Sequence, residues 1–363
     1  MPKQSGSDKL ILLSALVLSG MGSIMVYSAS AIMSMERYSD PYYFFKRQIM
    51  YIGVGLVLMI IAMNIDYHNY RNLTIPLLGA AFVLMVLVFI PPIGKAVNGA
   101  ARWIQFKMIR LQPSEIAKFA LIVYASHYIS KKRERMKDFK KGLMPLLIVI
   151  GLFFILLMKQ PDFGTVVTIA AVITILLFVG GMSIKYVFAV ILFAVPAIVM
   201  AVVLAPYRMK RWTAFMDPWA DAQGSGFQII QSMYAFARGG FWGLGFGEGR
   251  EKLFYLPAPH NDFILAVIGE EIGMIGVVTV IGLLFLYMYR GVMVAMRSND
   301  MFGMLLAVGI AALIGFQGVV NIAVNVGLMP TKGIPLPFVS YGGSSILFSL
   351  FSTGVLLNIS EHA

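Results

Sequence analysis

Long apolar runs recur along this sequence, and they constrain its fold more than any other feature. Several reach about 18 residues or more, the length that a helix needs to cross the hydrocarbon of a bilayer. Hydrophobic residues make up 59% of the chain, and its mean hydropathy is +0.82. A water-soluble protein of this composition would expose far too much apolar surface. The sequence therefore predicts an all-α, polytopic membrane protein.

We expect ten membrane spans, forming one membrane domain over residues 1–363. The connection between the seventh and eighth spans, residues 206–262, is the largest, and its apolar and aromatic content predicts that it is ordered. Two other connections, 91–112 and 328–343, also have unusual compositions. The predicted spans are 10–31, 48–63, 73–90, 113–130, 143–158, 162–181, 185–205, 263–289, 302–327 and 344–359.

Charge predicts the orientation of these spans. The connection Lys131–Lys141 carries seven Lys and Arg residues, which favours the cytoplasmic side. With an even number of spans, both termini are then cytoplasmic and 206–262 lies outside. This topology also places more Lys and Arg outside than inside, which charge-directed insertion does not explain. An anionic ligand on the outer face or attraction to lipid phosphates would account for the excess.

Absent residue types and motifs exclude several chemistries. The chain has no cysteine, so disulfides, thiolate catalysis and cysteine-ligated metals are excluded. Its histidines, His68, His127, His260 and His362, are far apart and lack metal-ligand spacing. No phosphate-binding loop or nucleotide fingerprint is present, and no nucleic-acid partner is expected.

The stretch "LPAPHNDFILAVIGEE" brings several ionisable groups to the start of the eighth span. Its prolines prevent a helix before about residue 260, so Asp262 lies at the outer mouth of the span. There Asn261 or Asp262 could cap the helix, or Asp262 could serve as a general base or cation ligand. Glu270 and Glu271 lie deeper, where a carboxylate must be paired, protonated or facing a polar cavity.

Other charged residues lie within or beside the spans. Glu115 and Lys118 are three residues apart in the fourth span, so they share one helical face. They could neutralise each other or form a polar wall facing a substrate head group. Asp162 begins the sixth span, where the helix dipole favours a carboxylate.

Cations and a Pro/Gly-rich segment suggest ligand contacts outside the spans. Arg208, Lys210 and Arg211 follow the seventh span and could clamp phosphates, or form an interfacial belt with Trp212 and Trp219. The segment "PTKGIPLPFVSYGGSS" has too much Pro and Gly for a membrane helix and is expected to line a cavity or re-enter the membrane. Lys332, Ser340 and Tyr341 are then candidate ligand contacts.

These motifs resemble the SEDS family (shape, elongation, division and sporulation proteins). The stretch "NIAVNVGLMPTKGIPLPFVSYGGSS" matches the family's signature, and "NGAARWI", "LQPSEIAK", "QPDFGT", "KLFYLPAPHNDFI" and "VIGEE" fit its pattern. The resemblance covers nearly the whole chain and is closer to the division members than to the elongation members. Asn261 and Ala258 depart from the family's usual threonine and acidic residue, which puts fine substrate contacts in doubt.

The resemblance implies a peptidoglycan glycosyltransferase that polymerises lipid II at the outer face of the cytoplasmic membrane during cell division. It implies that Asp262 is the essential residue, which we assign as the general base of an inverting transfer. A class B penicillin-binding protein and other division membrane proteins are the implied partners. A divalent cation, Mg²⁺ or Mn²⁺, could assist, although the sequence shows no metal cluster. The residues we assign to substrate binding are Arg102, Glu115, Lys118, Arg208, Lys210, Arg211, Lys252, His260, Lys332, Ser340 and Tyr341.

A lipid II flippase is the main alternative, because Glu115, Lys118, Glu270 and Glu271 within the membrane could support transport. Against it, the sequence shows no inverted repeat, and its distinctive chemistry lies on one face. A scaffold that only recruits division proteins is a third possibility.

Overall fold

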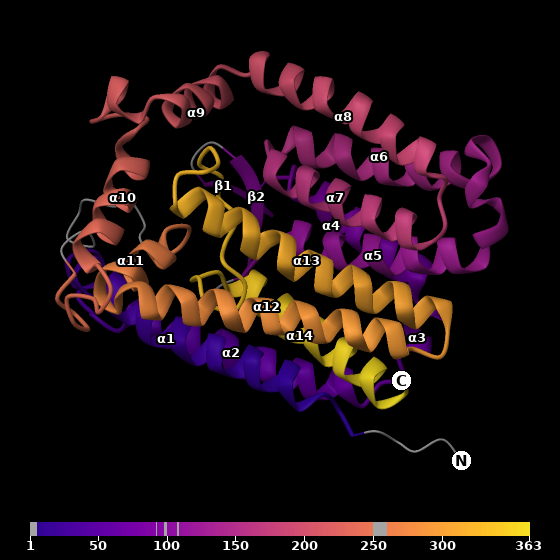
Figure 1. The fold of residues 1–363 in the computed structure, drawn as a ribbon, viewed down its shortest axis with the longest axis horizontal. Helices are drawn as coiled ribbons and strands as arrows, with labels where there is room; N and C mark the ends of the chain where they lie inside the picture. Colours follow the sequence, from indigo (N-terminus) through magenta and orange to yellow (C-terminus); the bar gives the residue numbers. More distant parts are fainter. Residues whose placement is uncertain (1–5, 92, 98–99, 107–108, 250–259) are drawn as a thin grey trace.

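The protein is a bundle of long helices that lie side by side in the computed structural model (Figure 1). The structure describes residues 6–91, 93–97, 100–106, 109–249 and 260–363. Within these residues, one long helix corresponds to each of nine predicted spans and a broken helix to the eighth, so the predicted fold class is confirmed. The long helices are α1 (Lys9–Tyr38), α2 (Tyr43–Met63), α4 (Thr74–Leu87), α5 (Pro113–Lys131), α6 (Met144–Lys159), α7 (Phe163–Val179), α8 (Ile184–Val203), α12 (Gly273–Arg297), α13 (Met301–Asn325) and α14 (Gly343–Glu361).

Length and apolar composition alone identify seven possible membrane spans among the described residues, and α4 and α7 are shorter apolar helices. Short elements connect the long ones. Two ends of the bundle are distinct in Figure 1: α9 and α10 lie at one end, which we call the loop end, and α3 and both chain termini lie at the other. The short elements are α3 (His68–Asn72), η1 (Arg133–Lys137), η2 (Phe139–Leu143), α9 (Pro206–Met216), η3 (Pro218–Asp221), α10 (Phe227–Gly239) and α11 (Ile264–Glu271).

The eighth span is broken, whereas the sequence predicted one helix over 263–289. α11 ends at Glu271 and α12 begins at Gly273, whose φ of +74° favours glycine. The loop after α10 packs into this break: Leu244 N–H donates to the Glu270 carbonyl at 2.9 Å. A Cβ on Gly273 would lie 2.5 Å from the Phe241 carbonyl oxygen, so a side chain does not fit there. Apolar residues lie on both sides of the break, so the apolar pattern predicted one continuous span.

The connection 91–112 contains a small sheet that was not predicted. Its antiparallel strands β1 (Gly94–Val97), β2 (Ala100–Phe106) and β3 (Ile109–Leu111) lie in the order β1-β2-β3. Ile104 of β2 is fully buried and fixes one face of the sheet against the bundle. The sheet lies outside the predicted spans, and it carries Arg102 to the loop end.

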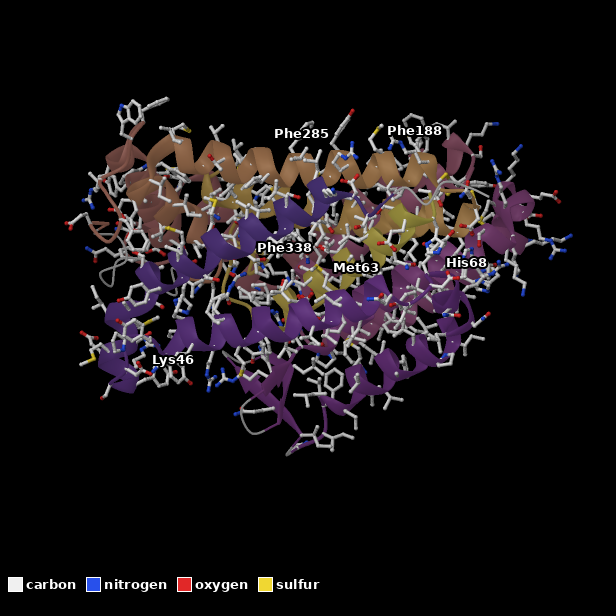
Figure 2. All side chains as sticks on the ribbon, turned by 90° about the horizontal axis from the view of Figure 1, so that it is seen from below. Lys46, Met63, His68, Phe188, Phe285 and Phe338 are labelled. Atoms are coloured by element: carbon white, nitrogen blue, oxygen red, sulfur yellow. The ribbon has the colours of Figure 1, made fainter. Side chains whose placement is uncertain are left out.

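Helix α13 is the centre of the bundle, and α8 is its periphery. α13 contacts α5, α7, α12 and α14, and it buries residues along its whole length. α8, in contrast, has no buried residue among those whose side chains are described. Its Phe188 and Phe193 side chains are 66% and 74% exposed, and Phe188 projects from the surface in Figure 2, as Phe285 of α12 does. Such apolar outer surfaces are suited to lipid.

Helix α1 buries a face that is rich in serine. Ser14, Ser23 and Ser30 each donate to a carbonyl three or four residues earlier in the same helix, at 2.6–2.9 Å. Ser28 instead donates to the Glu271 carboxylate at 2.7 Å. These small side chains let α1 pack closely against α11, α12 and α14, as small residues do between membrane helices.

Candidate functional site

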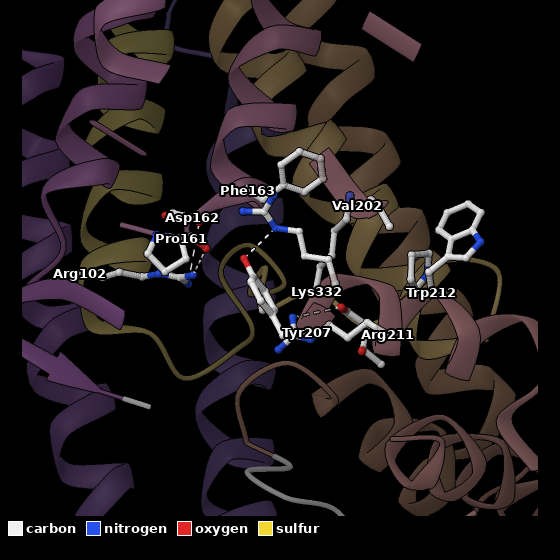
Figure 3. A pocket seen from close by; sticks show the side chains of 14 residues that line it. Arg102, Pro161, Asp162, Phe163, Val202, Tyr207, Arg211, Trp212 and Lys332 are labelled. Atoms are coloured by element: carbon white, nitrogen blue, oxygen red, sulfur yellow. Dashed lines mark hydrogen bonds and ion pairs between the residues drawn. The ribbon is translucent and has the colours of Figure 1, made fainter. Parts of the chain in front are cut away.

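A cavity of about 380 Å³ opens at the loop end of the bundle (Figure 3). It lies between the start of α7, the end of α8, α9, strand β2 and the segment that follows α13. Four of its side chains are cationic and one is a carboxylate. The lining residues are Arg102, Pro161, Asp162, Phe163, Gly164, Val202, Tyr207, Arg208, Arg211, Trp212, Pro330, Thr331, Lys332 and Gly333.

Arg102 and Asp162 form one wall of the cavity. Arg102 donates to the carbonyls of Gln160 (2.9 Å) and Pro161, and it lies 3.9 Å from the Asp162 carboxylate. Asp162 also accepts from the Thr165 hydroxyl at 2.9 Å and caps α7, as its position predicted. Because Asp162 is already held by these groups, it neutralises only part of the positive charge around the cavity.

Two of the remaining cations lie over the aromatic ring of Phe163. The guanidinium of Arg208 lies 4.9 Å from the ring centre and the ammonium of Lys332 lies 5.5 Å from it. Arg208 is further oriented by the Tyr207 hydroxyl (2.7 Å) and the Ala201 carbonyl (2.8 Å). Burial lowers the pKa of Lys332, and no carboxylate pairs with it among the described residues. A cation in that state gains from an anionic ligand.

Asp262 lies beside this cavity. A Cβ built on Gly333, which lines the cavity, would lie 3.4 Å from the Asp262 carboxylate, so the carboxylate lies next to this part of the lining. Desolvation raises the pKa of Asp262 to about 6, while the positive charge of Arg211 opposes the rise. Arg211 is fixed from the other side by a bond of 3.3 Å to the Thr331 carbonyl. A carboxyl with this pKa accepts a proton more readily than an ordinary aspartate.

The capping role considered for Asn261 and Asp262 is not observed. α11 begins at Ile264, and its N-cap residue is Phe263, which provides no side-chain hydrogen bond. Among the described residues, none donates a hydrogen bond to the Asp262 carboxylate, whereas its main-chain carbonyl accepts two. The carboxylate of Asp262 is therefore available for a ligand at the cavity edge.

The charged groups in the membrane are held within the bundle. Lys118 and Glu115 are buried in α5 and form an ion pair of 2.8 Å, as their spacing predicted. Glu271 accepts from Ser28 and from the Gly247 N–H (3.2 Å), so it stabilises the loop that packs into the break. Glu270 is fully buried beside it.

Several other residues predicted to bind substrate do not line the cavity. Lys210 lies on α9 next to Arg211 but does not line the cavity. His260 and Tyr341 pack together with Phe44 of α2, at ring distances of 4.4–5.5 Å. Burial lowers the pKa of His260 to about 4, so it is neutral at pH 7.

The buried hydroxyl of Ser340 accepts from the Leu336 N–H at 2.9 Å, which gives it a structural contact. Lys252 lies outside the described residues.

Several residues of the site were not selected from the sequence. Phe163 lies in the "QPDFGT" motif, in which only Asp162 was considered for a role. Tyr207 and Trp212 adjoin cations that were selected. Asn321 and Asn325 lie in the family signature, but their spacing of four residues within an apolar helix was the only signal, and it is also typical of packing.

This arrangement can bind an anion and place a carboxyl next to it. Two arginines fixed by hydrogen bonds and a half-buried lysine suit a diphosphate, and Asp262 is close enough to the cavity to exchange a proton with a ligand there. Among the described residues, no group of three or more His, Asp or Glu side chains could hold a metal ion. We therefore assign no step to a metal.

Fold and site together define a multi-pass membrane protein with a cavity lined by four cationic side chains at the loop end. The chain belongs to the FtsW/RodA/SpoVE family of cell cycle proteins, whose pattern it matches over residues 8–363. It is 46% identical over 362 residues to a protein of Geobacter sp. strain M18, covering 100% of this chain and 99% of that one. It is 48% identical over 353 residues to one of Trichlorobacter lovleyi, covering 97% and 93%. Both relatives are named "Probable peptidoglycan glycosyltransferase FtsW".

A solved structure shares the fold. It describes the structural coordination of polymerization and crosslinking by a peptidoglycan synthase complex, and the matching chain has a TM-score of 0.81 at 29% sequence identity. The alignment covers 98% of each chain, so the similarity includes both the bundle and the loop end.

Proposed function

We propose that this protein is a peptidoglycan glycosyltransferase that polymerises lipid II into glycan strands during cell division. The observation that carries the proposal is the position of Asp262, a carboxyl with a raised pKa, beside a cavity with four cations. Lipid II combines a lipid tail, a pyrophosphate and a sugar, so its enzyme needs a cationic pocket near the membrane surface. The names of the relatives support the same activity.

Asp262 acts as the general base in this proposal. It takes the proton of the acceptor sugar's 4-hydroxyl while that oxygen attacks the anomeric carbon of the donor. The bond from that carbon to the pyrophosphate breaks, and the leaving group departs with its electron pair. Attack from the opposite face converts an α-linkage into a β-linkage, so no covalent enzyme intermediate forms.

The cavity cations stabilise the departing pyrophosphate. Arg102 and Arg208 are held in place by backbone and side-chain acceptors, so little reorganisation is needed when negative charge develops. The ammonium of Lys332 lies over the same Phe163 ring as Arg208 and provides a further charge. Asp162 contributes one negative charge against four cations, so the cavity keeps a net positive charge.

We further propose that the loop end faces outward from the cytoplasmic membrane and that both termini are cytoplasmic. The basic connection Lys131–Lys141 supports this orientation. A class B penicillin-binding protein is the proposed transpeptidase partner within a larger division assembly. The solved synthase complex, which coordinates polymerization with crosslinking, supports a partner of this kind.

The test is polymerisation of purified lipid II by the detergent-solubilised protein, with and without its transpeptidase partner. The wild type should form glycan strands, and Asp262→Asn should abolish them while the protein stays folded. Asp262→Glu should also be poor, since an added methylene displaces the base from its position. Near wild-type polymer length and rate in Asp262→Asn would overturn the assignment of the base.

A lipid II flippase is the second candidate, and the buried Glu115–Lys118 pair is the observation that favours it. Lipid II supplied in detergent needs no flipping, so a protein that only transports would form no polymer in the same assay. A scaffold would also form none, but it would not translocate lipid II in vesicles. The three functions are therefore separated by two measurements.

A further inference from the structure

Two buried asparagines meet the main chain at the proposed base. Asn321 and Asn325 lie four residues apart on α13, and each is 1% exposed. The Nδ2 atoms of both donate to the carbonyl oxygen of Asp262, each at 2.9 Å. Both lone pairs of that oxygen are thus occupied by side chains of one helix.

Asn325 takes part in the hydrogen bonding at the start of α11. In a regular helix the Asp262 carbonyl would accept from the Ala266 N–H. Here the Ala266 N–H is shared between the Phe263 carbonyl at 3.1 Å and Asn325 Oδ1 at 3.2 Å, while Asn325 Nδ2 donates to the Asp262 carbonyl at 2.9 Å. The carboxamide therefore bridges the Asp262 carbonyl and the Ala266 N–H at the start of α11. Since an N–H can only donate, this bond also fixes which amide atom is oxygen.

Asn321 connects the same point to the cavity segment. Its second proton is donated to the Ile334 carbonyl at 2.9 Å, two residues beyond Lys332. The Asn321 side chain therefore links the main chain of Asp262 to the main chain of Ile334, which lies two residues after the cavity cation Lys332. Asn325 Nδ2 also contacts Asn321 Oδ1 at 3.2 Å, so the two side-chain amides support each other.

We propose that Asn321 and Asn325 are positioning residues that hold Asp262 at a fixed distance from the cationic cavity. This inference rests on the proposed function, in which Asp262 is the base. Neither asparagine lines the cavity, so they act through the main chain of Asp262 and not by touching substrate. Their removal should lower the rate of the chemical step and leave substrate binding by the cations largely intact.

The chain offers a matched control in Asn358 of α14. It is 3% exposed, and it also bridges two main-chain groups, accepting from the Tyr67 N–H and donating to the Met63 carbonyl, each at 2.8 Å. It lies at the end of the bundle that carries α3, away from the cavity. Asn358→Leu therefore removes an equivalent buried amide that has no connection to the base.

The experiment compares Asn321→Leu with Asn358→Leu in the lipid II assay, with unfolding of each protein measured in the same detergent. We expect Asn321→Leu to lower kcat about 100-fold, the effect of a displacement of about 1 Å, with KM within about threefold of wild type. Asn358→Leu should lose stability but keep the kcat of wild type per folded molecule. Equal kcat in the two variants would reduce Asn321 to a structural residue and overturn the proposal.

Two further arms keep the result interpretable. If Asn321→Leu fails to fold, Asn325→Asp retains the acceptor for Ala266 and removes the amide donor, and it should lower kcat in the same direction at pH 8. Unchanged kcat in folded Asn325→Asp would count against the proposal. Two controls separate the hypotheses: if the wild type forms no polymer with or without its partner, the proposed function fails, and if Asp262→Asn polymerises normally, Asp262 is not the base. If Asp262→Asn is inactive while Asn321→Leu is fully active, only the positioning role fails.

Discussion

The rate of glycan polymerisation should follow the ionisation of Asp262. Desolvation raises the pKa of its carboxyl to about 6, and a general base acts in its ionised form. With that pKa, about half of the molecules carry the carboxylate at pH 6, about one tenth at pH 5 and about nine tenths at pH 7. We therefore expect kcat at pH 5 to be about one tenth of kcat at pH 7.

Arg211 should set where this acid limb lies. Its positive charge holds the pKa of Asp262 below the value that burial alone would give. Arg211→Gln removes that charge, so the pKa should rise and the acid limb should move to higher pH. Each unit of rise corresponds to about 1.4 kcal/mol and to a tenfold lower rate well below the pKa. Lys210→Gln is the matched control, because Lys210 is the adjacent cation on α9 and does not line the cavity.

The assay is initial polymerisation of lipid II in detergent between pH 4.5 and pH 8 at saturating substrate. Recovery of activity after return to pH 7.5 shows that acid has not unfolded the protein. Two results would refute the reasoning: an acid limb near the ordinary aspartate pKa of 3.8, or an equal shift in Arg211→Gln and Lys210→Gln. The first result would mean that Asp262 is not the titrating base. The second would mean that Arg211 has no specific effect on the pKa of Asp262.

Three further predictions follow from groups already described. Folding raises the pKa of Asp262 from 3.8 to about 6, so the ionised carboxylate destabilises the folded protein increasingly between pH 4 and pH 6 and fully above pH 6. Asp262→Asn should therefore increase the free energy of unfolding by up to about 3 kcal/mol at pH 8 and by progressively less toward pH 4. Unfolding in detergent measures this change. Glu115→Gln or Lys118→Met alone should cost about 3–5 kcal/mol by leaving a buried charge unpaired. The double variant should regain stability yet polymerise slowly if Lys118 steadies the substrate, and full activity would leave only a structural pair. Single cysteines at Asp138 and Gln223 should react with an impermeant thiol reagent from opposite sides of the membrane, and labelling of both from outside would reverse the topology.

The sequence predicted the helices well because their apolar runs report directly on the membrane. The predicted fourth span, 113–130, begins at the same residue as α5 and ends one residue before it; Pro113 occupies a favoured first-turn position. The Glu115–Lys118 pair was also predictable, since it depends only on the geometry of one helix. Arg102, Arg208, Arg211 and Lys332 were selected individually, and the structure brings them to one cavity.

Features that depend on contacts between distant segments were not predictable. The break before Gly273 requires the loop after α10, and nothing in the apolar pattern of 264–289 reports that loop. The role of Asn321 and Asn325 on α13 depends on their hydrogen bonds to Asp262, which lies 59 and 63 residues earlier in the chain. The aromatic partners of His260 come from α2 and the segment before α14, which local sequence cannot bring together.

The serine bonds within α1 also bear on how the chain is synthesised. α1 precedes its partner in the chain, because Glu271 lies 243 residues after Ser28. At about 5–20 residues per second, roughly 12–50 s pass before that partner is made. During this interval Ser14, Ser23 and Ser30 can satisfy their hydroxyls on their own helix. The nascent α1 can therefore be stable in lipid before its partner helices are synthesised, because these hydroxyls are satisfied within the helix. Ser28 can form its bond to Glu271 once α11 is in place.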